Sequence, residues 1–459
     1  MRKNTTRLGL LAISAAVPVV VATPAAAQDA DSRAAEIAEL RAQIEALTAR
    51  VDELEREDRA SVTTLTNSDV PPAADTAVAE TPVDASEPPF DVAWKGAPVI
   101  EGRGGWSFKP RGRFNFDAGV VDAPSGTGVD DGFGSEARRI RLGVEGDIPG
   151  GFGYKVEVDF AEGAEITDAI LTYGSGGATI TIGQHNNFQS LDELTSSRFT
   201  SHIERAAFTD AFGFERLLGV SAEYLSGDVL IQGGVFSDNI EDLPGERWGV
   251  DGRAVYLPKI GDSQMHLGGS LHYADIAPAD SLRYRYRPLV HFTDTRFVDT
   301  RSFDARSERG IGLESAFISG PFHAAGEAFW QTVSRPGDIE DADFFGGYAE
   351  VGYFLTSGDT RGYKAGVFDR VKPANPVGEG GFGALQVNLR YDYLDLTDGV
   401  ITGGMQNGYI ASLVWTPTDY TRFLMSYGRL AYDGAVIPAK DGETSYSVDS
   451  LGVRAQIDF

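Results

Sequence analysis

The chain has 459 residues, a formal net charge of −27 and a mean hydropathy of −0.18. So low a hydropathy excludes a bundle of membrane-spanning helices, and the acidic balance argues against a nucleic-acid partner, which would need a basic surface. Cysteine is absent, which excludes disulfide bonds and thiolate metal sites. With 55 Gly, 17 Tyr and 26 Phe, the composition favours a large exported β-protein with tight turns.

The N-terminus has the pattern of a secretory signal peptide. Arg2, Lys3 and Arg7 precede an apolar run from Leu8 to Val21, and a small-residue cleavage pattern follows at 25–27. This predicts a signal peptide over residues 1–27. A retained membrane anchor is the alternative, although the run is short for the roughly 20 residues of a spanning helix.

Residues 28–60 are predicted to form a short N-terminal coiled-coil helix. Their apolar residues recur at alternating spacings of three and four, with Glu and Arg on the flanks, which is the pattern of a heptad seam. A coiled coil this short usually implies self-association. The alternative is a lone amphipathic helix packed on the rest of the protein. The seam consists of Ile37, Leu40, Ile44, Leu47, Val51 and Leu54.

Residues 61–104 are predicted to be a flexible linker. They are rich in Pro, Ala, Thr and acidic residues and contain Pro71-Pro72 and Pro88-Pro89. Such a composition shows no periodicity and buries little apolar surface.

From about residue 105 onward the apolar residues recur with a period of two, which is typical of β-strands. Tyr154, Val156, Val158 and Phe160 alternate with charged residues, and the segments 385–393 and 423–427 show the same alternation. A soluble β-sandwich also alternates, but its outward face is polar, whereas here the outward face is apolar with aromatic residues near the strand ends. The sequence therefore predicts an all-β fold: a transmembrane antiparallel β-barrel of about 16 strands over residues 105–459, wide enough for an aqueous channel.

The connections between the strands are expected to differ at the two ends, because periplasmic turns are short and outer loops are long. Short turns are predicted at 147–152, 174–177, 226–227, 258–263, 319–320 and 416–419. Longer loops are predicted at 122–135, 185–214, 237–248, 276–308, 334–342, 396–404 and 431–443. The region 355–381 is unusually long for a turn.

The last nine residues are predicted to form the strand that closes the barrel. Apolar residues occupy the odd positions from Leu451 to Phe459, and polar residues or glycine occupy the even ones. One face of such a strand meets lipid and the other meets the lumen. This orientation puts Phe459 at the periplasmic end, where we expect the barrel-assembly machinery to recognise the strand.

Six segments, in their order and spacing, identify a family: Arg138–Glu145, Gly153–Phe160, Asp168–Tyr173, Ile203–Arg205, Arg283–Pro288 and Leu385–Leu396. With these segments, the chain from about Gly112 to Phe459 resembles the phosphate-selective porin O and P family. The resemblance implies a homotrimeric porin of the Gram-negative outer membrane that passes phosphate and related small inorganic anions. It also implies that the coiled coil lies in the periplasm as the stalk or clamp of the trimer.

The family conducts anions along a ladder of arginines, and the resemblance implies this role for Arg139, Arg141, Arg283, Arg285 and Arg287. The strand period supports these positions, because 139 and 141 lie opposite an apolar face and 283, 285 and 287 share one face of an extended segment. Guanidinium groups hold phosphate oxygens through paired hydrogen bonds, and a row of them passes the anion along without a deep trap. The same period directs four more cations inward: Arg113, Lys155, Arg390 and Arg454.

The alternative for any lumen arginine is that it only pairs with an acidic neighbour. The candidate partners are Asp117, Glu145, Glu157, Asp159 and Asp392.

The connection 185–214 resembles, by its position, the inward-folding constriction loop of the family. Arg198 and Arg205 would then help to set the narrowest point. The alternative is an outer loop that rests on the rim of the barrel.

The function predicted from the sequence is passive diffusion of small anions, with no cofactor, no metal and no catalysis. An outer-membrane barrel enzyme would need a convergent Ser/His/Asp set, and none is evident. The histidines His266 and His272 are too widely spaced for a metal site, and the acidic segment 338–343 lacks the EF-hand spacing. The alternative function is a general or weakly selective porin whose coiled coil tethers the outer membrane to the cell wall.

Overall fold

A computed structural model describes residues 90–129, 132–242, 247–276 and 281–459. The predicted signal peptide, the coiled-coil helix and residues 61–89 of the predicted linker lie outside the described residues. In the part of the chain that is described, no helix is long and apolar enough to cross a membrane.

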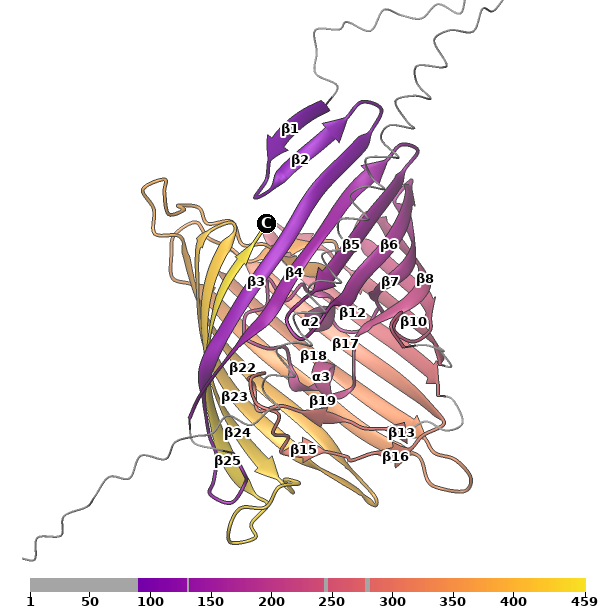
Figure 1. Cartoon of the computed structure of the whole chain (residues 1–459), viewed down its shortest axis with the longest axis vertical. Coiled ribbons are helices and arrows are strands. Elements are labelled where there is room, and N and C mark those ends of the chain that lie inside the picture. Colours follow the sequence, from indigo (N-terminus) through magenta and orange to yellow (C-terminus); the bar gives the residue numbers. More distant parts are fainter. Residues whose placement is uncertain (1–89, 130–131, 243–246, 277–280) are drawn as a thin grey trace, which may run out of the picture. The chain divides into compact units, whose positions relative to one another are not determined.

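The described residues form a closed antiparallel barrel of sixteen strands, which confirms the predicted all-β barrel (Figure 1). Each strand pairs with the next one along the chain, and β25 pairs with β3 to close the barrel. The strands are β3 (Trp106–Asp122), β4 (Phe133–Ile148), β5 (Phe152–Asp159), β6 (Glu165–Ser175), β7 (Ala178–Asn186), β8 (Arg216–Ser226), β9 (Val229–Phe236), β10 (Trp248–Tyr256), β12 (Ser263–Asp275), β17 (Ser307–Ser319), β18 (Phe322–Ser334), β19 (Ala342–Phe354), β22 (Ala384–Asp398), β23 (Ile401–Thr418), β24 (Thr421–Asp433) and β25 (Tyr446–Asp458).

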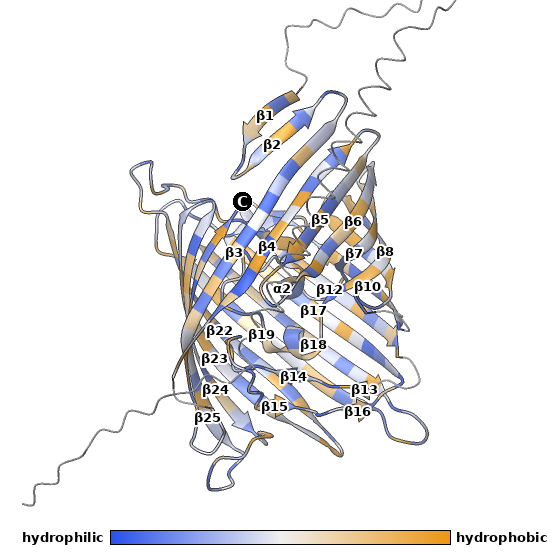
Figure 2. Cartoon of the chain, viewed as in Figure 1, coloured by the Kyte–Doolittle hydropathy of each residue, from blue (hydrophilic) through white to orange (hydrophobic). Residues whose placement is uncertain are grey.

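Hydrophobic and hydrophilic residues alternate along the strands of the barrel wall (Figure 2), and the apolar ones are exposed whereas the polar ones are buried. On β25, Val453 and Ile457 are 41% and 47% exposed, whereas Arg454 and Asp458 are only 4% and 2% exposed. A soluble protein would bury the apolar face instead. The closing strand therefore alternates as predicted, with lipid as the solvent of its outer face.

Two short strands precede the barrel. β1 (Phe90–Trp94) pairs with β2 (Pro98–Gly102), and β2 pairs with the beginning of β3. The prediction of a flexible linker is therefore wrong for residues 90–102. Backbone pairing with a barrel strand forms this hairpin, and composition alone does not report such pairing.

The two ends of the barrel differ in the length of their connections. Turns at 149–151, 176–177, 227–228, 320–321 and 419–420 and the 257–262 connection, with β11 (Lys259–Ile260), lie at the end that carries the C-terminus, at the top of Figure 1. At the opposite end lie connections 123–132, 160–164, 187–215, 237–247, 276–306, 335–341, 399–400 and 434–445.

The predicted loop at 396–404 is wrong. β22 and β23 pair as far as Asp398 and Ile401, which leaves a two-residue turn in which Gly399 has a φ of 55°. The polar residues near the end of β22 have the composition of a loop, but they continue the strand ladder. The region 355–381 is an exception to the short turns at its end of the barrel. There the long 355–383 connection joins β19 to β22.

Three connections contain structure of their own. The 187–215 connection contains α2 (Leu191–Leu194) and α3 (Ala207–Ala211). The 276–306 connection contains β13 (Ser281–Leu282), β14 (Arg285–Tyr286), β15 (Val298–Asp299) and β16 (Phe303–Asp304). The 355–383 connection contains the hairpin of β20 (Gly362–Lys364) and β21 (Val367–Asp369).

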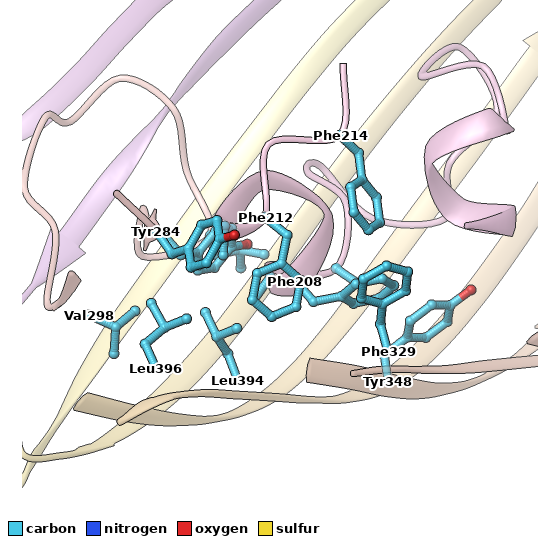
Figure 3. Packing of buried hydrophobic residues seen from close by; sticks show 14 of the residues in the cluster. Phe208, Phe212, Phe214, Tyr284, Val298, Phe329, Tyr348, Leu394 and Leu396 are labelled. Atoms are coloured by element: carbon cyan, nitrogen blue, oxygen red, sulfur yellow. The ribbon is translucent and has the colours of Figure 1, made fainter. Parts of the chain in front are cut away.

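The main hydrophobic core lies inside the barrel, between these connections and the inner wall (Figure 3). Phe208 and Phe212 of the 187–215 connection pack against Phe329 of β18, and Phe212 also packs against Tyr284 of the 276–306 connection. Gly346 on β19 permits this packing, because a Cβ there would lie 2.3 Å from the Cβ of Phe208. The inward connections are thus anchored by ordinary apolar burial.

We expect Phe208→Ala to destabilise the inward packing by about 3–5 kcal/mol, because it removes a fully buried ring and leaves a cavity. Denaturant unfolding and limited proteolysis of the 187–215 connection measure this effect. Phe133→Ala is the control, since Phe133 is 72% exposed at the beginning of β4. Equal protease sensitivity of the two variants would contradict the assignment of this core.

Candidate channel lining and constriction

The 187–215 connection crosses the lumen and is bonded to the far wall. The amides of Leu191 and Asp192 donate to the Glu327 carboxylate of β18 at 2.8 and 2.7 Å. The amide of Ala207 donates to the Asp392 carboxylate of β22 at 3.0 Å. These bonds confirm that the connection folds inward, and they exclude the alternative of a loop resting on the rim.

The two predicted arginines of this connection have different surroundings. Arg205 donates to the carbonyl oxygens of Asp192, Glu193 and Thr195, each at 2.9 Å, so its guanidinium clamps the loop onto itself. Arg198 lies 3.6 Å from the carboxylate of Asp458, towards the end of the short turns. Arg205 therefore holds the shape of the 187–215 connection by binding its backbone.

The inward-facing cations of β3 to β5 are paired with carboxylates. Arg141 lies 2.7 Å from Asp159, and Lys155 lies 2.9 Å from Asp168. Arg113 lies 3.7 Å from Glu157, which Arg111 and Arg141 also approach. The direction predicted for Arg113, Arg141 and Lys155 agrees with the structure, but each has an acidic partner as the alternative interpretation expected.

Arg390 and Arg454 belong to buried networks that tie the constriction to the wall. Arg390 lies 3.0 Å from Glu350 and 3.6 Å from Asp192. Arg454 binds Asp117 through two hydrogen bonds of 2.7 Å and also contacts Glu204 at 2.8 Å. The acidic partner considered for this region, Asp392, is instead used by the amide of Ala207.

Glu204 is the centre of the second network. Burial would raise the pKa of Glu204, but Arg138, Arg139 and Arg454 hold its pKa well below the usual range. Arg138 binds it at 3.0 Å, whereas the nearest nitrogen of Arg139 is 3.9 Å away. Arg139 is 5% exposed, and in the described structure its Nε and Nη1 have no hydrogen-bond partner.

Arg283, Arg285 and Arg287 lie on the 276–306 connection. Their side chains alternate with Tyr284 and Tyr286, each 3% exposed, which point into the aromatic core. The three arginines therefore share one face, as their spacing predicts, but on an inward connection and not on a barrel strand. Arg283 binds Asp299 at 2.8 Å, and Arg287 donates to the carbonyl of Thr293 at 3.1 Å.

Two cavities of about 210 and 330 Å³ lie at the loop end and share Asp210, Glu215 and Arg287 in their walls. Among the described residues, ten arginines and six carboxylates line the pair. The arginines are Arg138, Arg139, Arg141, Arg205, Arg216, Arg247, Arg283, Arg285, Arg287 and Arg296. We call these two spaces the mouth cavities.

Sequence reasoning missed Arg138, Arg216, Arg247 and Arg296 as lining residues. Arg296 belongs to the same predicted loop as Arg283, so the loop assignment was a usable signal for it. Arg216 is the first residue of β8, and Arg247 is the last residue before β10. At such junctions between a loop and a strand, no local pattern indicates which way a side chain points.

The 355–383 connection folds into the barrel from the other end. Arg361 donates to the carbonyl of Phe199, and the amide of Phe368 donates to the Thr195 hydroxyl at 3.2 Å. Arg253 of β10 donates to the carbonyl of Gly366 at 2.8 Å. The hairpin of β20 and β21 is thus bonded both to the 187–215 connection and to the barrel wall.

A closed barrel with an apolar outer face, a polar lumen and a connection folded across that lumen defines an outer-membrane porin. Residues 108–459 match the family model of the phosphate-selective porin O and P, which is most of the chain. The protein therefore belongs to the phosphate-selective porin O and P family, and it is a channel of the outer membrane. Family and fold are those of a channel and not of an enzyme.

The chain is also similar to a curated protein and to solved structures. An uncharacterized protein of Caulobacter vibrioides is 44% identical over 484 residues, covering 98% of this chain and 96% of its own. The outer-membrane OmpT of Vibrio cholerae has a TM-score of 0.51 at 10% identity, over 79% of this chain and 100% of that one. The outer membrane channel DcaP of Acinetobacter baumannii has a TM-score of 0.51 at 15% identity, over 78% and 99%. At these identities the two structures show the fold alone.

Proposed function

We propose that this porin conducts small inorganic anions, phosphate or polyphosphate among them, by passive diffusion. The observation that carries the proposal is the charge of the mouth cavities. Arginines outnumber carboxylates by ten to six there, in a chain whose net charge is −27. A cationic mouth in an acidic protein concentrates anions at the entrance of the lumen.

Some arginines of the mouth cavities have unused hydrogen-bonding capacity. Within the described structure, the Nε and Nη1 atoms of Arg139 and of Arg296 have no partner. Burial, together with the neighbouring Arg287, lowers the pKa of Arg296 to about 10. Crowded cations with free donors favour a bound anion, which neutralises their repulsion and accepts their hydrogen bonds.

The ion pairs deeper in the lumen limit how selective the channel becomes. Arg390 and Arg454 each have a carboxylate partner within 3.0 Å, so they present little net charge to a passing solute. We therefore place the selectivity of the proposed anion channel at the mouth cavities, and within them at Arg139 above all. A general or weakly selective porin is the second candidate, and these neutral pairs favour it.

Planar-bilayer recordings under a KCl gradient test the proposal. We expect the reversal potential to have the sign of the chloride equilibrium potential, as for an anion-selective channel. We also expect added phosphate to reduce the chloride current, because phosphate would occupy the arginines of the mouth cavities. A channel that prefers potassium would overturn the proposal, and a channel with no preference would support the general porin.

A further part of the proposal concerns export and assembly. We propose that residues 1–27 direct export, that residues 28–60 form a periplasmic coiled coil, and that the porin is a homotrimer inserted by the barrel-assembly machinery. Deleting residues 28–89 distinguishes a trimer stalk from a tether to the cell wall. Loss of the trimer on gel filtration indicates a stalk, whereas an intact trimer in cells with a weakened envelope indicates a tether.

A further inference from the structure

Three side chains from separate segments converge at the rim of the loop end. Glu136 lies on β4, Glu162 lies in the 160–164 connection, and His291 lies in the 276–306 connection. One donor atom of each lies within 4.8 Å of the other two. We infer that Glu136, Glu162 and His291 bind a divalent transition-metal ion of the Zn²⁺ type.

The hydrogen bonding of the Glu136 carboxylate is the first support for this site. One carboxylate oxygen, Oε2, lies 2.9 Å from Nδ1 of His291. The other, Oε1, is buried and has no hydrogen-bond partner in the described structure. A buried carboxylate oxygen without a partner is costly, and a cation supplies the missing interaction.

The neighbouring Arg138 does not supply the missing partner of Glu136. The closest basic neighbour on β4, Arg138, donates to both carboxylate oxygens of Glu204 at 3.0 and 3.4 Å. Its guanidinium is therefore directed at Glu204 and not at Glu136.

The donor set selects the kind of metal. Two carboxylates balance the charge of a divalent ion, and an imidazole nitrogen favours Zn²⁺ and its neighbours over Ca²⁺ and Mg²⁺, which prefer oxygen ligands alone. Zn²⁺ commonly takes three protein ligands and one water, with donor atoms about 3.4 Å apart. Glu162 is exposed in a five-residue connection, so it can close the remaining distance by a small movement.

The proposed metal site lies beside the mouth cavities, so a bound ion would affect the entrance of the channel. His291 follows Arg287 by four residues on the connection that carries four arginines of the mouth cavities, and His291 itself lines one of the two cavities. The adjacent Phe292 packs on Gly134 of β4, where a Cβ would lie 2.3 Å from its ring. A bound ion would therefore pin the arginine-bearing connection to the rim and add positive charge beside the entrance.

The histidine is far from the two glutamates in the chain, since Glu136 and His291 are 155 positions apart. This separation explains why the sequence led us to expect no metal site. The site becomes visible only when the 276–306 connection is placed against β4.

Zinc titration tests the inference. The whole chain, without a polyhistidine tag, is folded in detergent and titrated with ZnCl₂ by calorimetry. We expect one Zn²⁺ per chain, and we expect His291→Gln and Glu136→Gln to weaken binding by at least about tenfold. The matched control is Glu340→Gln, which removes an exposed acidic group from the neighbouring 335–341 connection and should leave the affinity unchanged.

Heat-modifiable migration on gels shows that each variant is folded, so a lost barrel is not mistaken for a lost site. The inference is overturned if folded His291→Gln binds Zn²⁺ as tightly as the unaltered chain, or if the unaltered chain binds no Zn²⁺. Because the readout is binding, its failure would leave the proposed anion conduction untouched.

Discussion

Replacing Arg454 with methionine is expected to lower the free energy of unfolding by about 3–5 kcal/mol, because it leaves buried carboxylates without their partner. Arg454 on β25 faces Asp117 on β3 across the seam that closes the barrel. Arg454 and Asp117 are 4% and 1% exposed, so little water reaches the orphaned charge. Glu204 keeps a partner in Arg138, and the penalty therefore falls mainly on Asp117.

Guanidinium-induced unfolding followed by tryptophan fluorescence measures this loss. The control is Arg429→Ala, which breaks a cross-strand pair of similar length, Arg429 to Asp449 at 2.9 Å, on an exposed surface. That change should cost no more than about 1 kcal/mol. The double variant Arg454→Met with Asp117→Leu should recover part of the stability, since both charges are then absent. If Arg454→Met is no less stable than Arg429→Ala, the buried seam pair does not hold the barrel closed.

The barrel was predictable because lipid imposes a local pattern on each strand. Leu142, Val453 and Ile457 were assigned outward from a period of two alone, and all three are exposed on the outer face. The same period gave the inward direction of Arg454 and Arg390. Neither result requires knowledge of which strand is adjacent, because every strand of a barrel faces the same two environments.

A β-bulge shows where this local pattern fails. The pairing of β3 with β4 shifts between Asn115 and Phe116, so that Arg138 is an extra residue on β4. Arg138 and Arg139 both turn towards Glu204, although a strict period of two would send them to opposite faces. The sequence contains no signal for the bulge, so of these two cations of the mouth cavities only Arg139 was predicted.

The ion-pair partners of the lumen arginines could not be predicted from the sequence for a different reason. Asp117 and Arg454 are 337 positions apart, and Ser201 and Ser412 bond across the lumen over 211 positions. The first contact depends on which strands meet where the barrel closes, and the second depends on how the 187–215 connection folds into the barrel. The direction of a strand residue is a local property, whereas its ion pair is a property of the whole lumen.

The second large effect concerns three of the arginines of the 276–306 connection, Arg283, Arg285 and Arg287. We expect Arg283→Ala, Arg285→Ala and Arg287→Ala together to lower the ratio of anion to cation permeability by about tenfold, because a charged cleft concentrates counter-ions by at least that factor. The change removes three of the ten arginines of the mouth cavities and leaves the six carboxylates in place. The excess of positive charge then falls almost to zero.

Reversal potentials under a KCl gradient measure this ratio, and the effect should shrink at high salt, where the Debye length falls to about 3 Å. The matched control removes three cations of the same end that do not line the mouth cavities: Arg309→Ala, Arg429→Ala and Lys440→Ala. Both triple variants change the net charge of the chain equally. If they shift the reversal potential by the same amount, overall charge sets the preference and the three arginines are bystanders. If only the first variant shifts it, the preference originates at the mouth cavities, where the inward connection holds its guanidinium groups over the lumen.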